Sequence, residues 1–120
     1  MHCVSQTAAF IRQANEAGMT EDEVEDLVNF LANNPDAGDP IAGTGGCRKL
    51  RWAGRGKGKS GGYRTITFYS GTEIPAFLLA AFSKGEKVNL SKAERNALAT
   101  MTKRLLEAYT DRVVDVGARS

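Results

Sequence analysis

The spacing of apolar positions predicts two helices in the first third of the chain. The first spans Thr7 to Ala17, and Gly18 is placed to end it. The second spans Glu21 to Asn34, where Thr20 and Glu23 form a capping box and Pro35 follows the end. The stripes expected to face a core are Phe10, Ile11, Ala14 and Ala17 in the first helix, and Val24, Leu27, Val28 and Leu31 in the second.

A third helix is predicted near the C-terminus. Ser91 and Glu94 form another capping box, and the helix is expected to end near Tyr109. Its apolar face is predicted to consist of Leu98, Met101, Leu105 and Ala108 or Tyr109. The periodicity weakens afterwards, so residues 110–120 are expected to fray.

Period-two alternation predicts strands between the second and third helices. In Cys47–Ala53, Leu50 and Trp52 alternate onto one face of the strand, and Arg48 lies on the same face. In Tyr63–Tyr69, Ile66 and Phe68 likewise share a face, and Arg64 lies on it. The two arginines are therefore expected at the ends of core-facing rows. Ile74–Phe82 is apolar at both parities, as in a strand covered on both sides. The predicted order of elements is ααβββα. A short strand that begins at Ile41 would add one more β before the hairpin.

Length and composition are those of one globular domain. The chain has 120 residues, 42% of them hydrophobic and 25% charged. No basic segment followed by an apolar one marks an export signal, and the longest apolar run, Ile74–Phe82, is far too short to span a bilayer. We therefore expect a single domain over residues 1–120 and a cytoplasmic location.

Charge is distributed unevenly along the chain, although the net charge is only +2. Residues 1–39 carry eight acids and one base (−7), residues 40–72 carry seven bases and no acid (+7), and residues 73–120 carry eight bases and six acids (+2). The central bases are Arg48, Lys49, Arg51, Arg55, Lys57, Lys59 and Arg64. Such a glycine-rich, acid-free segment repels itself, so an anion is its natural ligand. We expect a β-hairpin with a long basic loop.

Two nucleotide-binding motifs are imitated in this segment. Ala53 with Gly58-Lys59-Ser60 approximates a P-loop, and Gly56, Gly58 and Gly61 match a dinucleotide fingerprint. Both motifs require a helix directly after the glycines, and the strand-like Tyr63–Tyr69 follows here instead. Neither interpretation is therefore favoured.

Metal and nucleophile chemistry find little support in the sequence. His2, the single histidine, is expected to be inert at a mobile terminus, and no metal or cofactor is predicted. Cys3 and Cys47 lack ligand spacing and are expected to be reduced thiols. A serine or cysteine nucleophile would need a histidine partner. The acids of residues 21–26 are expected to be a helical first turn and a solvated face.

Lysine and arginine alone can act on RNA. Crowded lysines have lowered pKa values because each charge disfavours protonation of the next, so one could remove a proton from a ribose 2′-OH. Arginines fixed on strands could stabilise the extra charge on a pentacoordinate phosphorus. The plainer alternative is that the segment only binds a polyanion backbone.

Three ordered blocks, GTGGCRKLRW, GKGKSGGYRT and KGEKVNLSKAE, are similar to motifs of the HigB-like branch of the RelE/ParE superfamily of bacterial type II toxins. The resemblance covers Phe10 to Tyr109. It implies an α+β fold with two N-terminal helices and a C-terminal helix packed on a small, twisted, mostly antiparallel sheet (the RelE-like microbial RNase fold). It also implies ribosome-dependent cleavage of mRNA in the A site and an antitoxin with a helix-turn-helix domain, HigA-like, that blocks the toxin.

The resemblance assigns site residues by position. It implies catalytic roles for Lys57, Lys59, Arg64 and Lys84, and a phosphate contact for Arg51. The other cations predicted to contact RNA or phosphate are Arg48, Lys49, Arg55 and Lys87. After Lys84 the chain lacks the Tyr or His that some relatives use, so Glu86 or a lysine is left as the general base. The expected partners are mRNA, 16S rRNA and the antitoxin, with no membrane, and the free toxin is expected to be a monomer. The alternatives are a ParE-type inhibitor that binds DNA gyrase without cleaving anything, and an RNA-binding module without catalysis.

Overall fold

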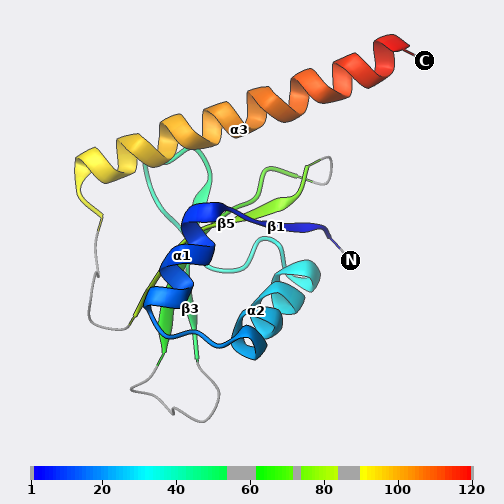
Figure 1. The fold of residues 1–120 in the computed structure, drawn as a ribbon. Helices are drawn as coiled ribbons and strands as arrows, with labels where there is room; N and C mark the ends of the chain where they lie inside the picture. The colour runs from blue at the N-terminus through cyan, green and yellow to red at the C-terminus, as the bar shows by residue number, and fades with distance from the viewer. Residues whose placement is uncertain (1, 54–61, 72–73, 84–89, 120) are drawn as a thin grey trace.

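The structure is a computed structural model that describes residues 2–53, 62–71, 74–83 and 90–119, the last ten of these as backbone. It contains three helices and a five-stranded mixed sheet of order β1-β5-β4-β3-β2. Figure 1 shows α3 on one side of the strands and α1 and α2 on the other. The elements in chain order are β1 Val4–Gln6, α1 Ala8–Glu16, α2 Glu21–Asn33, β2 Asp39–Pro40, β3 Cys47–Trp52, β4 Tyr63–Phe68, β5 Ala76–Ser83 and α3 Lys92–Arg119. The predicted α+β class and the mostly antiparallel sheet are confirmed.

The first two helices begin and end where their caps predict. Thr7 Oγ1 accepts a hydrogen bond from the Phe10 N–H (3.1 Å), and Gly18 has φ +86° directly after α1. At α2, Thr20 Oγ1 accepts from the Glu23 N–H (3.2 Å) while a Glu23 carboxylate oxygen accepts from the Thr20 N–H (2.9 Å). The predicted capping box is therefore present.

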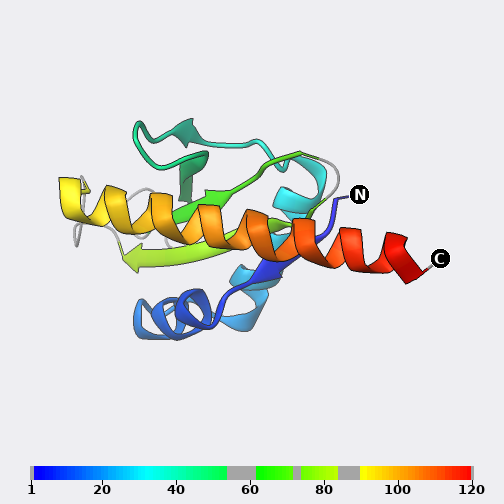
Figure 2. The ribbon, with the colours of Figure 1, turned by 90° about the horizontal axis from the view of Figure 1, so that it is seen from above.

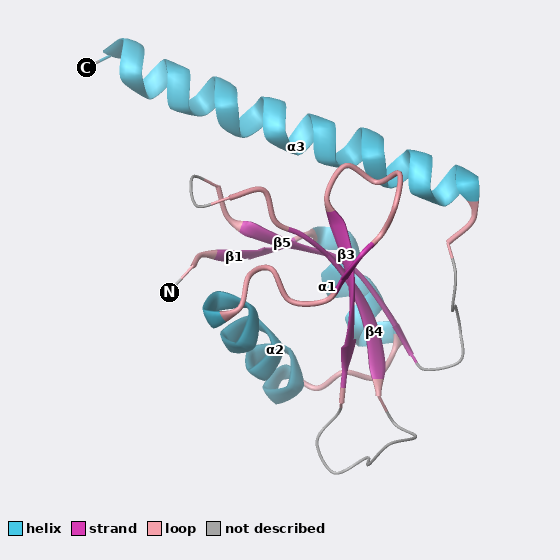
Figure 3. Ribbon diagram, turned by 180° about the vertical axis from the view of Figure 1, so that it is seen from behind, coloured by secondary structure: helices cyan, strands magenta, loops and turns pink. Residues whose placement is uncertain are grey.

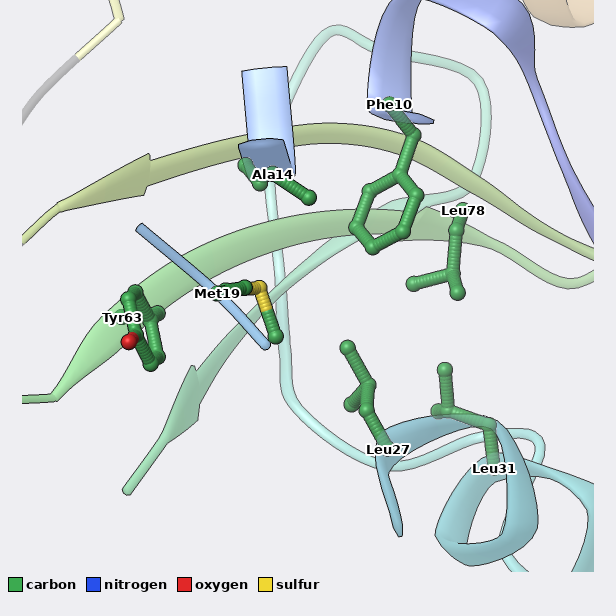
Figure 4. Packing of buried hydrophobic residues seen from close by; sticks show 8 residues of the cluster. Phe10, Ala14, Met19, Leu27, Leu31, Tyr63 and Leu78 are labelled. Carbon is green, nitrogen blue, oxygen red and sulfur yellow. The ribbon is translucent and has the colours of Figure 1, made fainter. Parts of the chain in front are cut away.

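A first core cluster fills the space between these helices and one face of the sheet (Figure 4). Helical side chains meet strand side chains in it: Phe10, Ala14, Met19, Leu27 and Leu31 pack with Tyr63, Leu78 and Ala81. The prediction of Ile11 as a core residue is wrong, because its side chain is 55% exposed. Ile11 instead lines a hollow of about 570 Å³ beside α1 and α2.

A second core cluster lies on the opposite face of the sheet, under α3. It contains Cys47, Ile66, Phe68, Phe77, Leu79 and Ala80, against which Leu98, Leu105, Leu106 and Tyr109 of α3 pack. The register of β4 with β5 shifts between Ile66 and Thr67, which pair with Ala80 and Leu78. One residue of β5 is skipped there, so odd-numbered and even-numbered positions of β5 exchange faces at this point. Because both faces of β4 and β5 are covered, the apolar run at both parities is explained, and the prediction of a covered strand at residues 74–82 is confirmed for Ala76–Ser83.

The third helix begins as predicted but has a different length and apolar face. Ser91 and Glu94 make the reciprocal hydrogen bonds of a capping box (2.9 and 3.1 Å). The helix continues to Arg119, so its predicted end near Tyr109 is wrong; Figure 2 looks down on its whole length across the strands. Met101 is 39% exposed, and Thr102 is buried in its place.

Two short strands at the sheet edges differ from the predictions. β1 was not predicted; it pairs in parallel with β5, with Val4 opposite Ala76. His2 beside it is held rather than loose, because its N–H donates to the Ala32 carbonyl (2.7 Å) and its Nε2 lies 2.8 Å from the Ile74 carbonyl oxygen. The short strand expected from Ile41 lies just before it, at Asp39–Pro40.

Candidate functional site

The centre of the candidate site is a pair of arginines on neighbouring strands. Arg51 of β3 and Arg64 of β4 are direct cross-strand partners. Directly opposed residues share a face of a sheet. The pairs Cys47–Phe68 and Lys49–Ile66 lie on the same face as the two arginines, and the second core cluster shows that α3 covers this face. Arg51 is exposed and Arg64 is half-buried. The site is therefore built on two rigid strands (Figure 3) rather than on loop backbone alone.

Arg64 presents a donor that no described residue uses. Its Nε is buried and has no hydrogen-bond partner in the part of the chain that the structure describes. A buried, unsatisfied donor on a charged group carries a desolvation cost of about 1–3 kcal/mol or more. An acceptor on a ligand, such as a phosphate oxygen, would remove that cost.

Like charges directly opposed across strands also destabilise a sheet. Arg51 and Arg64 form such a pair, and Lys49 adds a third cation on the same face, two residues before Arg51. In the part of the chain that the structure describes, none of these three side chains has an acidic partner. The face is thus arranged to bind an anion.

The structure separates Arg48 from these three cations. Arg48 opposes Thr67 and so lies on the other face of the sheet, where Nη1 donates to the Gly38 carbonyl (3.2 Å). Both arginines lie in core-facing rows as expected, but Arg48 is on the face of the first core cluster and Arg64 is on the face of the second. The hydrogen bond of Arg48 holds the segment before β2 against β3, which is a structural role.

The glycine-rich turn before β3 packs closely against Thr102 of α3. Gly43, Gly45 and Gly46 have φ values of +77°, +76° and +123°, and a Cβ at Gly45 would lie 2.9 Å from Thr102 Oγ1. Thr102 Oγ1 donates to the Thr44 carbonyl (3.1 Å), and Thr44 Oγ1 accepts from the Cys47 N–H (3.2 Å). This turn fixes α3 over the start of β3, and so sets how much of the cationic face stays open.

Five predicted site residues lie outside the described residues: Arg55, Lys57, Lys59, Lys84 and Lys87. The strands that lead to them are described. β3 and β4 pair antiparallel up to Trp52 and Tyr63, which confirms the predicted hairpin, and β5 ends at Ser83, directly before Lys84. Their predicted roles stay predictions.

Arg95 on α3 is a site residue that the sequence analysis missed. It is half-buried and lines a hollow together with Lys49. A weak signal was available, because a cation three residues before the apolar Leu98 lies near the face of α3 that packs on the sheet.

Neither a reactive thiol nor a metal site is found at the candidate site among the described residues. Both cysteines are free, and burial raises the pKa of the Cys47 thiol to about 11, against a smaller lowering by its hydrogen bond with Thr44. Cys47 is therefore an unreactive core residue, and it lies in β3, within the strand predicted there. Among the described residues, no three His, Cys, Asp or Glu side chains come together as metal ligands. In that part of the chain no helix is both long and apolar enough to cross a bilayer.

Comparison with protein families identifies the chain. The sequence model of a family described as "RelE toxin of RelE / RelB toxin-antitoxin system" matches residues 3–118. The match spans both core clusters and all the described cations of the site. It agrees with the helices packed on a mixed sheet. The chain therefore belongs to the RelE toxin family, whose members are the toxins of type II toxin–antitoxin systems.

Proposed function

We propose that this toxin belongs to the HigB-like branch of the superfamily and inhibits translation by cleaving mRNA in the ribosomal A site, without a metal ion. The observation that carries the proposal is the cross-strand pair of Arg51 and Arg64, in which the buried Arg64 Nε has no partner among the described residues. A preorganised, desolvated donor next to a second cation is what stabilises charge that develops in a transition state.

The reaction needs no group that the chain lacks. The ribose 2′-oxygen attacks the adjacent phosphorus, and the bond from phosphorus to the 5′-oxygen of the next nucleotide breaks. The products are a 2′,3′-cyclic phosphate and a free 5′-OH. A general base takes the 2′-OH proton, and a general acid gives a proton to the leaving 5′-oxygen. Between these steps, arginine and lysine side chains stabilise the negative charge on the oxygens of the pentacoordinate phosphorus.

Each predicted residue receives a role in this scheme. Arg64 stabilises the transition state through its guanidinium, and Arg51 contacts the phosphate from the opposite strand. Lys57 and Lys59 act as base and substrate clamps, and Lys84 acts as acid or phosphate contact. Lys49, Arg55 and Lys87 are further RNA contacts, whereas Arg48 supports the sheet from its other face.

The proposed partners follow from the family and from the charge distribution. A helix-turn-helix antitoxin of the HigA type neutralises the toxin, which is a monomer in the cytoplasm when free. The cationic face binds mRNA and 16S rRNA, and the acidic first 39 residues give the antitoxin a chemically distinct surface.

The test is a reconstituted translation reaction with a defined mRNA, scored for cuts within the reading frame. Arg64→Ala should lower the cleavage rate at least ~100-fold, a typical loss for one transition-state donor. Arg64→Lys should recover little, because a lysine keeps the charge but not the planar fork. Arg104→Ala, which removes an exposed arginine from α3, is the matched control and should cleave at the parent rate.

Four outcomes would contradict the proposal. Equal activity of Arg64→Ala and the parent would remove Arg64 from the mechanism. Binding of RNA without any cut would favour a non-catalytic module, and inhibition of DNA gyrase without cleavage would favour the ParE type. Cleavage of single-stranded RNA that stops in EDTA and returns only with added Mg²⁺ would overturn the metal-free mechanism.

A further inference from the structure

A hollow of about 460 Å³ opens beside the cationic face, between the β2–β3 edge of the sheet and the start of α3. Its lining combines three kinds of chemistry. Lys49 and Arg95 contribute cations, Asp39 contributes a carboxylate, and Pro40, Ile41 and Leu90 contribute apolar surface. These residues come from four separate stretches of the chain, so the combination exists only in the folded protein.

The two cations of the hollow have no partner among the residues that the structure describes. Among the described residues, neither the Lys49 nor the Arg95 side chain forms an ion pair or a hydrogen bond, although Asp39 is the cross-strand partner of Lys49. Both side chains are half-buried, which raises their electrostatic effect above that of fully solvated cations. The hollow is thus able to take a negatively charged group.

Lys49 connects the hollow to the site of proposed cleavage, because it lines the hollow and lies on the same strand face as Arg51. Lys49 and Arg51 are two residues apart on β3 and face the same side, so their backbones are separated by about 6.7 Å. One nucleotide of an extended strand spans a comparable distance from phosphate to phosphate. A strand whose phosphate lies at Arg51 and Arg64 therefore brings its neighbouring nucleotide to Lys49.

We propose that this hollow binds the nucleotide of single-stranded RNA next to the cleaved phosphate, an inference that rests on the proposed function. Lys49 and Arg95 hold its phosphate, and Pro40, Ile41 and Leu90 contact the face of the base. Asp39 accepts a hydrogen bond from a donor on the base edge or from the ribose 2′-OH. A carboxylate would repel a phosphate alone, so its place in the lining favours a whole nucleotide over a simple anion.

The experiment measures binding of fluorescein-labelled nine-nucleotide RNAs by anisotropy, in the Arg64→Ala background to prevent cleavage. The four homopolymers and their DNA counterparts are titrated at several KCl concentrations. Arg95→Ala and Lys49→Ala should each weaken RNA binding about three- to tenfold, and each should reduce the slope of log K against log[KCl] by about 0.7, the value for one phosphate on a single strand. Asp39→Asn should reduce the difference among the four bases or between RNA and DNA.

Arg104→Ala is again the matched control. Arg104 is an exposed arginine on the same helix, nine positions further and about 14 Å along its axis. Its loss should leave the slope unchanged. Equal slopes for Arg95→Ala and Arg104→Ala would overturn the proposal, as would undetectable RNA binding by the parent at about 50 mM KCl. Thermal melts of each variant show whether a lost slope reflects lost folding, and in that case Arg95→Gln replaces the alanine variant.

Two further measurements separate this proposal from neighbouring ones. If Arg95→Ala weakens binding to ribosomes without mRNA but not to the oligonucleotides, the hollow belongs to ribosomal RNA and the substrate assignment is wrong. If the parent binds RNA with the expected slopes but never cuts mRNA, the proposed function fails while the nucleotide site stands.

Discussion

The two faces of the sheet use the same strands but are covered very differently. On the side of α1 and α2, fully buried side chains such as Phe10, Leu27 and Leu78 close the interface. On the side of α3, the apolar contacts give way to Lys49, Arg51 and Arg64 towards the hairpin end of β3 and β4. Neighbouring positions on β4 show the contrast: Tyr63 belongs to the first core cluster, and Arg64 faces the other way.

This difference indicates a division of labour between stability and ligand binding. The first face gains free energy by removing carbon from water, at about 25 cal/mol per Å² of apolar surface. The second face instead keeps cations close together, which is unfavourable in the free protein. Under the proposed function, bound RNA relieves this repulsion. Substitutions on the two faces should therefore change different measurements.

The largest effect is expected from Leu27→Ala on the first face. Leu27 is fully buried, so its truncation should lower the free energy of unfolding by about 2–5 kcal/mol. Urea denaturation followed by circular dichroism measures it. Met101→Ala on the exposed side of α3 is the control and should change stability by less than about 0.5 kcal/mol. Similar losses for both variants would show that the first face is not the stabilising one.

How far the sequence predicts these faces depends on the range of the interactions involved. The capping boxes of α2 and α3 were predicted because each depends on residues three positions apart. β1 was missed because its three residues pair with β5, more than seventy positions away. Thr102 was missed because a buried threonine needs a tertiary partner, here the Thr44 carbonyl, that no periodicity reveals.

The candidate site shows the same limit. Alternation within one strand gave the parity of Arg48 and Arg64 correctly, but the faces of two strands can be compared only when their register is known. The observed register sets Arg64 opposite Arg51 and sends Arg48 to the other side. Arg95 joins the site only through the packing of α3, and the sequence contains no motif for it.

A smaller effect is expected from Tyr63→Phe, which tests whether the faces are independent. The Tyr63 hydroxyl donates to the buried Glu23 carboxylate (3.1 Å) and thus connects β4 to the start of α2. Its removal should cost about 1.5 kcal/mol of stability, as for a hydrogen bond to a charged group. The cleavage rate of the folded protein should not change. A slower reaction at full folding would show that the first face positions Arg64.

The smallest effect, and the one of opposite sign, is expected from Arg51→Gln. Removing one of two opposed cations should raise the free energy of unfolding by about 0.2–1 kcal/mol, while RNA binding and cleavage weaken. The gain should shrink as salt screens the repulsion. Arg104→Gln, an equal change of charge on α3, should leave both quantities nearly unchanged. A destabilised Arg51→Gln variant would mean that Arg51 supports the sheet instead of straining it.

The pairing of β1 with β5 has a consequence for the order in which the chain can assemble as it is synthesised. Val4 meets its partner Ala76 only after most of the chain exists, so the first strand to be made is among the last to be seated. The hairpin of β3 and β4, by contrast, closes from nearby residues, and early contacts of this kind form faster than distant ones. The arginine pair can therefore come together while one edge of the sheet is still open, before α3 has brought Arg95 to the hollow. A chain that stops short of α3 would carry the two arginines on a face whose second core cluster lacks the side chains of α3. The C-terminal helix must therefore be synthesised before this core and the hollow are complete.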